Sequence, residues 1–335
     1  MNHPWPFKRF LREDMPLLPS NFSPPWFLRN GHAQTLYAYL FRRVEGVSYC
    51  RERIATPDGD FLDLDFSPAG GRRLSIVSHG LCGDSRRPYV LGMVKALNQA
   101  GWDALAWNFR GWGGEINRKA RMTHSGATED LAAVVDHALS KGYEEIALIG
   151  FSLGGNITLK YVGEYGDGIH RALKRVVAFS TPVHLESCAR QLAKPVCKLY
   201  MSRFLKMLHG FIREKMADYP DLFNDLGYGQ IKNFKQFDDR YVAPLHGFKD
   251  AEDYWSRSSS ENVLESIRVP TLLVNAQNDP FLTEECFPKE KAEKNPFLFM
   301  EAPLSGGHVG FVDFHSKGAY WSERRALSFL KDGNF

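Results

Sequence analysis

Short apolar runs alternate with amphipathic stretches over much of this chain. The runs are rich in branched and aliphatic residues, so each is expected to be a buried strand. They lie at Leu74–Ser78, Asp103–Phe109, Glu145–Ile149, Arg175–Phe179, Thr271–Ala276 and Phe297–Met300. Helical patterns follow at Pro88–Ala100, Thr128–Ser140 (with Thr128 as the expected cap), Ile157–Tyr165 and Lys317–Lys331. This order predicts an α/β fold with a mostly parallel central sheet and helices on both faces.

The chain before the first of these runs follows a different pattern. Residues 1–50 are rich in aromatic residues and proline, and are expected to form an N-terminal arm with a short helix near Ala33–Arg42. Next, Arg53–Thr56 and Phe61–Phe66 flank the sequence Pro57-Asp58-Gly59. These three residues favour a tight turn, so the two segments are predicted to pair as a hairpin.

The alternation stops again after Pro182. Residues 183–262 are helical in pattern, aromatic and charged, with no run typical of a buried strand. An insertion at this point would lie over the carboxyl ends of the parallel strands, where such sheets bind ligands. We therefore expect a single α/β core made of residues 51–182 and 263–335, with a helical cap at residues 183–262 and the arm, residues 1–50, before it.

Composition and charge exclude several classes of protein. The net charge is only +3, from 42 basic and 39 acidic residues, which argues against a dedicated nucleic-acid surface. No apolar stretch is long enough to span a membrane, and no signal peptide is expected at the start. The five scattered cysteines contain no Cys-x-x-Cys pair, which argues against a disulfide framework or a zinc site. A soluble, cytoplasmic protein with reduced thiols is expected.

The segment Gly150-Phe151-Ser152-Leu153-Gly154 carries the clearest chemical signal. It joins a predicted strand to a predicted helix, so Ser152 would lie in the sharp turn called a nucleophile elbow. That turn strains the backbone of the serine and needs small residues two positions away on either side, which Gly150 and Gly154 provide. On its own Gly-x-Ser-x-Gly matches many ordinary loops, and the flanking strand and helix favour the catalytic interpretation.

A serine hydroxyl becomes an effective nucleophile only when a base takes its proton and an acid holds that base in one tautomer. In this order of strands and helices both partners follow the serine, in loops after later strands. Asp279 directly follows a predicted strand, and His308 lies in a glycine-rich loop after the last one. Asp-Pro is also a common turn former, and Glu284 and Glu285 are rival acids in a stretch expected to be solvated. We expect Ser152, Asp279 and His308 to form a catalytic triad.

The intermediate of acyl transfer carries an oxyanion, which needs two amide donors. The candidates are the backbone N–H groups of Leu153, directly after the serine, and Leu81, in the loop after the first buried strand. His79 is expected to order this loop through hydrogen bonds, and Cys82 to be a packed thiol rather than a nucleophile. His124 lies in another loop at this edge and is a candidate for a supporting role outside the triad.

Several segments together give residues 22–330 a resemblance to the YheT-like family of α/β-hydrolases. Besides the elbow and the segments around Asp279 and His308, they are Arg29-Asn30-Gly31-His32-Ala33-Gln34-Thr35, His79-Gly80-Leu81-Cys82-Gly83-Asp84, Asn108-Phe109-Arg110-Gly111 and His124-Ser125-Gly126. The resemblance implies an α/β-hydrolase fold with a cap, the triad named above, and carboxylester hydrolysis. Some eukaryotic members of the family are associated with medium-chain acyl transfer or phospholipid cleavage. The residues themselves give Asn30–Thr35 no catalytic role, and we interpret this segment as pinning the arm to the sheet.

We therefore predict a serine esterase that cleaves carboxylic esters with a short- to medium-chain acyl group. The aromatic residues within 183–262 are compatible with an apolar acyl pocket. Two alternatives stay open: acyl transfer to an alcohol with the same triad, and a non-catalytic ligand receptor on a hydrolase scaffold. Neither a metal nor a cofactor is expected, because the sequence has no metal-ligand spacing and no phosphate-binding glycine loop. The expected partner is a small-molecule ester, and the sequence does not indicate an oligomeric state.

Overall fold

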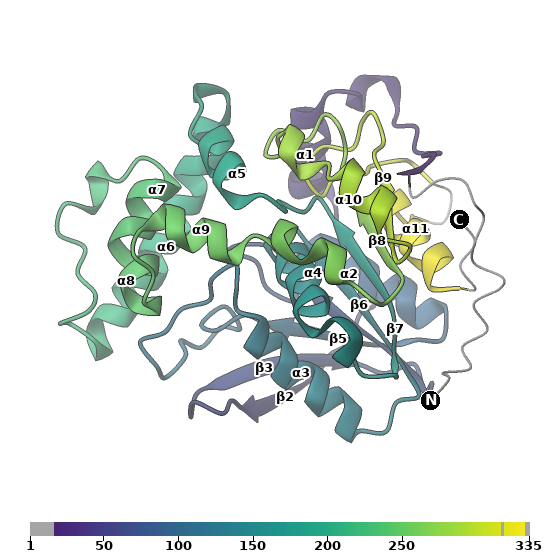
Figure 1. Ribbon diagram of the computed structural model, residues 1–335, viewed down its shortest axis with the longest axis horizontal. Coiled ribbons are helices and arrows are strands. Elements are labelled where there is room, and N and C mark those ends of the chain that lie inside the picture. Colours follow the sequence, from purple (N-terminus) through teal and green to yellow (C-terminus); the bar gives the residue numbers. More distant parts are fainter. Residues whose placement is uncertain (1–16, 316–317, 332–335) are drawn as a thin grey trace.

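The computed structural model describes residues 17–315 and 318–331 (Figure 1). Within these residues the strands form one nine-stranded sheet, in the order β1-β9-β8-β7-β6-β4-β5-β3-β2. The first seven strands in that order, β1-β9-β8-β7-β6-β4-β5, are all parallel to their neighbours. Strand β3 pairs antiparallel with both β5 and β2. The strands are β1 (Leu17–Leu18), β2 (Cys50–Ala55), β3 (Phe61–Ser67), β4 (Arg73–Ser78), β5 (Asp103–Asn108), β6 (Glu145–Phe151), β7 (Leu173–Phe179), β8 (Thr271–Val274) and β9 (Leu298–Glu301).

The sheet confirms the predicted fold class. All six predicted buried strands are present as β4 to β9, and their ends lie within about two residues of the predicted ones. The predicted hairpin is β2 and β3, with Ala55 paired to Phe61 across the turn. The short strand β1 was not predicted. Its residues pair with β9, Leu17 opposite Met300, and two residues are too few to show a periodic pattern.

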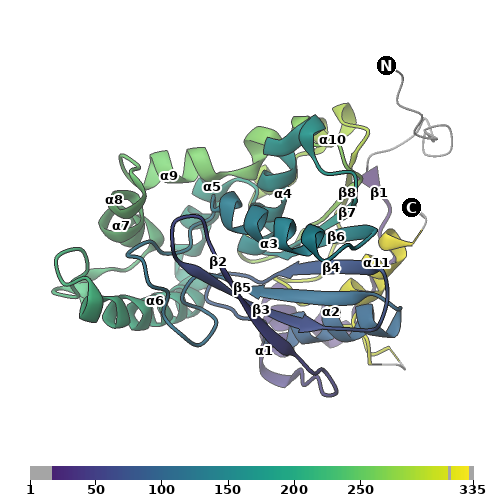
Figure 2. The same cartoon turned by 90° about the horizontal axis from the view of Figure 1, so that it is seen from below.

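Helices cover both faces of the sheet (Figure 2). On one face lie α3 (Thr128–Ser140), α4 (Leu153–Tyr165) and α10 (Lys289–Lys294), and on the other lie α1 (Gly31–Phe41), α2 (Pro88–Gln99) and α11 (Trp321–Leu330). Because successive strand residues point to opposite faces, each strand contributes to both apolar layers. Ile76 of β4 packs in the layer with α3 and α4, and the next residue, Val77, packs in the layer with α2 and α11.

Residues 183–262 contain helices and no strand, as predicted. Figure 1 shows them beyond the end of the sheet at which β6 leads into α4. Their buried side chains form an apolar cluster of their own, which Cys82 and Phe281 join from the sheet side. The helices are α5 (Leu185–Leu192), α6 (Lys198–Asp218), α7 (Phe234–Phe237), α8 (Ala243–His246) and α9 (Ala251–Ser258). The boundaries of arm, core and cap stay a prediction.

Two helix starts differ from the sequence-based expectation. Helix α4 begins at Leu153 rather than Ile157, because the turn at the end of β6 leads into the helix without an intervening loop. Thr128 is the first residue of α3 rather than its cap, and its Oγ1 donates to Oε2 of Glu164 in α4, 2.7 Å away. The predicted start of the last helix, Lys317, lies outside the described residues.

Candidate active site

Ser152 lies between β6 and α4 in a strained backbone conformation. Its φ is 53° and its ψ is −120°, values that residues other than glycine rarely adopt. The close packing around it explains both flanking glycines. A Cβ atom on Gly150 would lie 2.5 Å from the carbonyl oxygen of Gly154, and one on Gly154 would lie 2.4 Å from that of His79. The structure therefore has the elbow geometry that the sequence predicts, and the serine hydroxyl stands at the carboxyl edge of the sheet.

The structure brings the three predicted triad residues together in one chain of hydrogen bonds. Nε2 of His308 lies 2.9 Å from Oγ of Ser152, and Nδ1 of His308 lies 2.9 Å from Oδ2 and 3.2 Å from Oδ1 of Asp279. Asp279 is buried, and its Oδ1 also accepts the amide of Phe281 at 2.9 Å. With Nδ1 of His308 donating to the carboxylate, Nε2 is left as an acceptor for the serine proton.

The rival acids do not take part in this arrangement. Glu284 and Glu285 are exposed, in a short 3-10 helix after the Asp279 turn. Their exposure agrees with the solvation that the sequence indicates.

The segment before and within α1 holds the loop that carries His308. Oγ1 of Thr35 accepts the amide of His308 at 2.8 Å and donates to the carbonyl of Gly31 at 2.7 Å. The amide group of Gln34 pairs with both backbone groups of Val312, at 3.1 and 2.7 Å. The interpretation of Asn30–Thr35 as structural thus agrees with the structure, but the partner is the histidine loop rather than the sheet.

Thr35 and Gln34 are functional candidates that the sequence did not reveal. Their hydrogen-bond partners lie more than 270 positions further along the chain. The only available signal was a group of polar side chains in an otherwise apolar, aromatic segment.

The loop after β4 lies against the serine. A Cβ atom on Gly80 would be 3.2 Å from Cβ of Ser152, so this position needs a glycine for the approach. Nδ1 of His79 donates to the carbonyl of Gly80 at 2.8 Å, and its Nε2 accepts the amide of Phe109 at 3.2 Å. Burial lowers the pKa of His79 to about 4, so the ring is neutral and matches the ordering role that the sequence suggests. Burial also raises the pKa of Cys82, as expected for a packed thiol.

Two cavities meet at the triad. Their walls share five residues: Leu81, Ser152, Phe204, Phe281 and His308. The α9 cavity, about 820 Å³ including its open part, continues between the helices of residues 183–262. The α1 cavity, about 1450 Å³ including its open part, continues between α1 and α6. One serine hydroxyl is therefore accessible from two differently built spaces.

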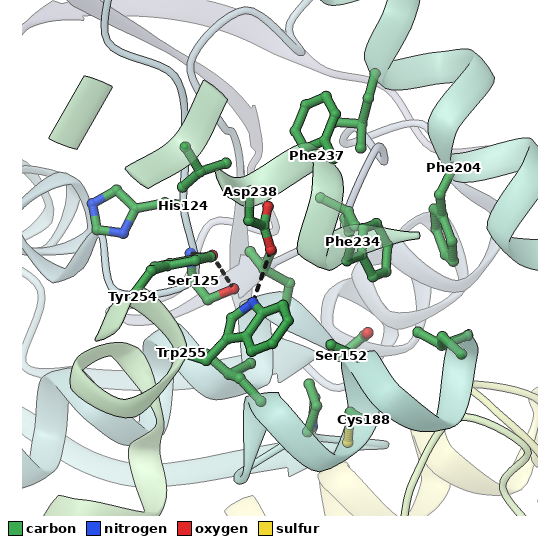
Figure 3. A pocket seen from close by; sticks show the side chains of 18 of the residues that line it. His124, Ser125, Ser152, Cys188, Phe204, Phe234, Phe237, Asp238, Tyr254 and Trp255 are labelled. Atoms are coloured by element: carbon green, nitrogen blue, oxygen red, sulfur yellow. Dashed lines mark hydrogen bonds between the residues drawn. The ribbon is translucent and has the colours of Figure 1, made fainter. Parts of the chain in front are cut away.

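The α9 cavity has mostly apolar walls with a polar group on one side (Figure 3). The hydroxyl of Tyr254 donates to Oγ of Ser125 at 2.8 Å, and the indole Nε1 of Trp255 donates to Oδ2 of Asp238 at 2.8 Å. His124 also lines this cavity. Its Nδ1 accepts the amide of Gly126 at 3.1 Å, and burial lowers its pKa well below the usual value. His124 is thus a neutral wall residue, beside the triad rather than part of it.

Among residues 17–315 and 318–331, no group of three or more His, Cys, Asp and Glu side chains could hold a metal ion. In the same residues no helix is both long and apolar enough to cross a bilayer.

Comparison with known proteins places this geometry in a family. The family model of the alpha/beta hydrolase fold matches residues 76–314. The chain is also 33% identical to "Putative esterase YheT" of Escherichia coli (strain K12), over 88% of this chain and 87% of that protein. This chain belongs to the YheT-like family of α/β-hydrolases. The resemblance suggested by the sequence motifs is thereby confirmed.

Other members of the α/β-hydrolase group are more distant. "Phospholipase ABHD3" of Mus musculus is 28% identical over 92% of this chain and 77% of that protein. Among solved structures, the Pyrococcus furiosus esterase Pf2001 has a TM-score of 0.58 and 19% identity, over 87% of this chain and 96% of that one. At this identity the likeness shows the shared fold. In this fold the serine, the acid and the histidine follow one another along the chain, as Ser152, Asp279 and His308 do here.

Proposed function

We propose that this α/β-hydrolase is a serine esterase that cleaves carboxylic esters. The observation that carries the proposal is the chain of hydrogen bonds from Asp279 through His308 to Ser152, where two cavities meet. Such a chain activates a weak nucleophile, because the histidine accepts the proton as the oxygen attacks. Ester hydrolysis also agrees with the names of two relatives, a putative esterase and a phospholipase.

In the first half of the reaction Oγ of Ser152 bonds to the ester carbonyl carbon, and its proton passes to Nε2 of His308. The carbonyl electron pair moves to oxygen and gives a tetrahedral oxyanion. When this intermediate collapses, the bond to the alcohol oxygen breaks, and His308 protonates that oxygen. In the second half water attacks the acyl-serine by the same steps and releases the carboxylic acid. Throughout, Asp279 fixes the ring of His308 and stabilises its positive charge.

The backbone amides of Leu81 and Leu153 are the proposed donors to the oxyanion. Leu153 is the first residue of α4, where an amide has no acceptor within the helix and the helix dipole favours negative charge. Leu81 directly follows Gly80, whose close approach to Ser152 supports the choice of the Leu81 amide as the second donor. Donors that are already in place stabilise the charge without reorganisation as it develops.

The two cavities suggest where each half of the ester binds. The α9 cavity has a mostly apolar wall with no lysine or arginine among its described residues, so we assign it to the acyl group. The α1 cavity has three arginines in its wall, Arg42, Arg87 and Arg203, and we assign it to the alcohol. A short- to medium-chain acyl group is the proposed substrate class.

The test uses p-nitrophenyl esters of graded acyl length with the wild-type protein and with Ser152→Ala. Wild type is expected to hydrolyse some of the series, and Ser152→Ala to retain less than about one part in 10³ of that activity. A fluorophosphonate probe should label wild type and leave the variant unlabelled. Equal inactivity of the two proteins on every ester, together with no labelling, would overturn the proposal.

A further inference from the structure

Asp238 is a buried acid in the wall of the α9 cavity. It opens a π-helical turn, Asp238–Val242, between α7 and α8, and only 7% of its surface is exposed. Its Oδ2 accepts the indole N–H of Trp255. Among the described residues, no lysine or arginine forms an ion pair with Asp238, and none lines this cavity. A π-helical turn is often found at a functional site, and here it points an acid toward the cavity (Figure 3).

A buried carboxylate without a cation is costly, so such a group keeps its proton instead. Burial raises the pKa of Asp238 to about 8, and the neighbouring charge of Asp239 acts in the same direction. At neutral pH the side chain is therefore a carboxylic acid. With Oδ2 accepting from Trp255, the other oxygen can carry the acid proton.

Two donors near Asp238 are already used. The indole N–H of Trp255 is donated to Asp238, and the phenol hydrogen of Tyr254 is donated to Ser125. The remainder of this part of the wall is apolar, with Phe204, Phe234 and Phe237 facing the same space (Figure 3). The hydroxyl of Thr123 in the same wall also has no partner among the described residues, so Asp238 is one of the few free hydrogen-bond donors that this largely apolar cavity offers.

We propose that the preferred ester has an acyl chain with an oxygen atom along it, as a keto, hydroxyl or ether group, and that Asp238 donates a hydrogen bond to that oxygen. This inference rests on the proposed function and names the substrate class of the same site. An unsubstituted chain would leave the buried acid unpaired, which disfavours its binding. Sites that hydrogen-bond one group of a substrate discriminate against analogues that lack it for the same reason.

The test is a set of p-nitrophenyl esters of equal length, either unsubstituted or with one keto or hydroxyl group at successive positions. For wild type, at least one oxygenated ester should have a kcat/KM about tenfold above its unsubstituted counterpart. Asp238→Leu should lose this preference, so that its kcat/KM values for the oxygenated and the unsubstituted ester become similar. Asp238→Asn should keep the preference, because its amide N–H₂ can donate while its oxygen still accepts from Trp255.

Trp255→Phe is the matched control for a purely structural role. It breaks the bond between Asp238 and Trp255 and leaves the acid in place, so the preference for the oxygenated ester should remain. If Trp255→Phe and Asp238→Leu lost the preference equally, Asp238 would act only by holding the two helical segments together, and the inference would be wrong. Should Asp238→Leu fail to fold, Asp238→Ala takes its place.

The wild-type protein alone can also overturn the inference. If it cleaved unsubstituted esters at Ser152 but preferred no oxygenated ester, the inference would fail and the proposed function would stand. If it cleaved no ester and bound no fluorophosphonate, the proposed function itself would fail.

Discussion

The two cavities that meet at Ser152 differ in the ionisable side chains of their walls. Both have largely apolar walls, and they share Ser152, His308 and three other residues. Among the described residues, the α9 cavity contains an acid, Asp238, and no lysine or arginine, whereas the α1 cavity contains three arginines and no acid. In the proposed reaction the two ends of the ester therefore enter spaces of different electrostatic character.

The strongest test of the shared centre is Asp279→Asn. Asparagine keeps the size of the side chain but favours the wrong tautomer of His308, so kcat should fall by about 10³–10⁴. Since the change acts through His308, which lines both cavities, the loss should be equal for all acyl and alcohol groups, as measured by kcat/KM over a panel of esters. Glu285→Gln, at an exposed neighbouring acid, is the control and should leave the rates unchanged. A loss confined to one group of esters would contradict the account.

The next test concerns the protonation of Asp238 in the α9 cavity. It compares the stability of Asp238→Asn with that of wild type as a function of pH. The pKa of Asp238 is raised from 3.8 to about 8, so only well below pH 4 is this carboxyl protonated in both the folded and the unfolded chain. As the pH rises toward 8 the unfolded chain loses this proton and the folded one keeps it, which lowers the stability of wild type. The variant lacks this loss, and its advantage should grow between pH 4 and pH 8 by a few kcal/mol, on the order of 1.4 kcal/mol per pH unit at most.

Urea unfolding at a series of pH values measures this difference. A gap between variant and wild type that stays constant from pH 4 to pH 8 would show that the carboxyl of Asp238 is ionised in the folded protein. In that case it could not donate the hydrogen bond proposed above.

Two adjacent residues of α6 allow a matched test of the assignment of the cavities. Leu208 lines the α9 cavity and Met207 lines the α1 cavity. Leu208→Trp should lower kcat/KM about tenfold for longer acyl chains and less for acetate, because the indole fills acyl space. Met207→Trp should instead affect esters of bulky alcohols. The kcat/KM values of both variants are measured over one set of esters that vary in acyl and in alcohol length. If the assignment were the reverse, Leu208→Trp would affect bulky alcohols and Met207→Trp would affect long acyl chains.

The smallest effect is expected for Arg203→Glu in the α1 cavity. Arg203 is exposed and lies over the ring of Tyr39, 4.4 Å from its centre. Reversing its charge should lower kcat/KM for an ester of an anionic alcohol by about three- to fivefold relative to a neutral one, and added salt should reduce the difference. Arg213→Glu, on the same helix but outside both cavity walls, is the control. An equal effect of the two substitutions would point to net charge alone.

The sequence predicts the reactive centre well because its signals are local. A strand, a strained turn and a helix identify Ser152, and the order of the remaining strands leaves few positions for an acid and a histidine. The same order predicts the sheet and the hairpin. The two-residue strand β1 could not be predicted, because it is defined by its pairing with β9 and not by a pattern in its own sequence.

The residues of the cavity walls could not be predicted, because they are brought together by contacts between segments that lie far apart in the sequence. Asp238 stands next to Asp239 and Arg240, a context typical of a solvated surface, and only the packing of the π-helical turn against Trp255 buries it. Thr35 supports the His308 loop through a contact across most of the chain. The fold and the candidate triad could thus be proposed from motifs, whereas the walls of the two cavities depend on how distant segments pack.

The most direct test of the central claim is to trap the acyl-enzyme. A fluorophosphonate or a slowly hydrolysed ester is incubated with the protein, and the modified peptide is identified by mass spectrometry. The account predicts a single adduct on Ser152, absent in Ser152→Ala and formed far more slowly in His308→Ala. Modification of another residue, or hydrolysis of esters that continues undiminished in Ser152→Ala, would contradict it.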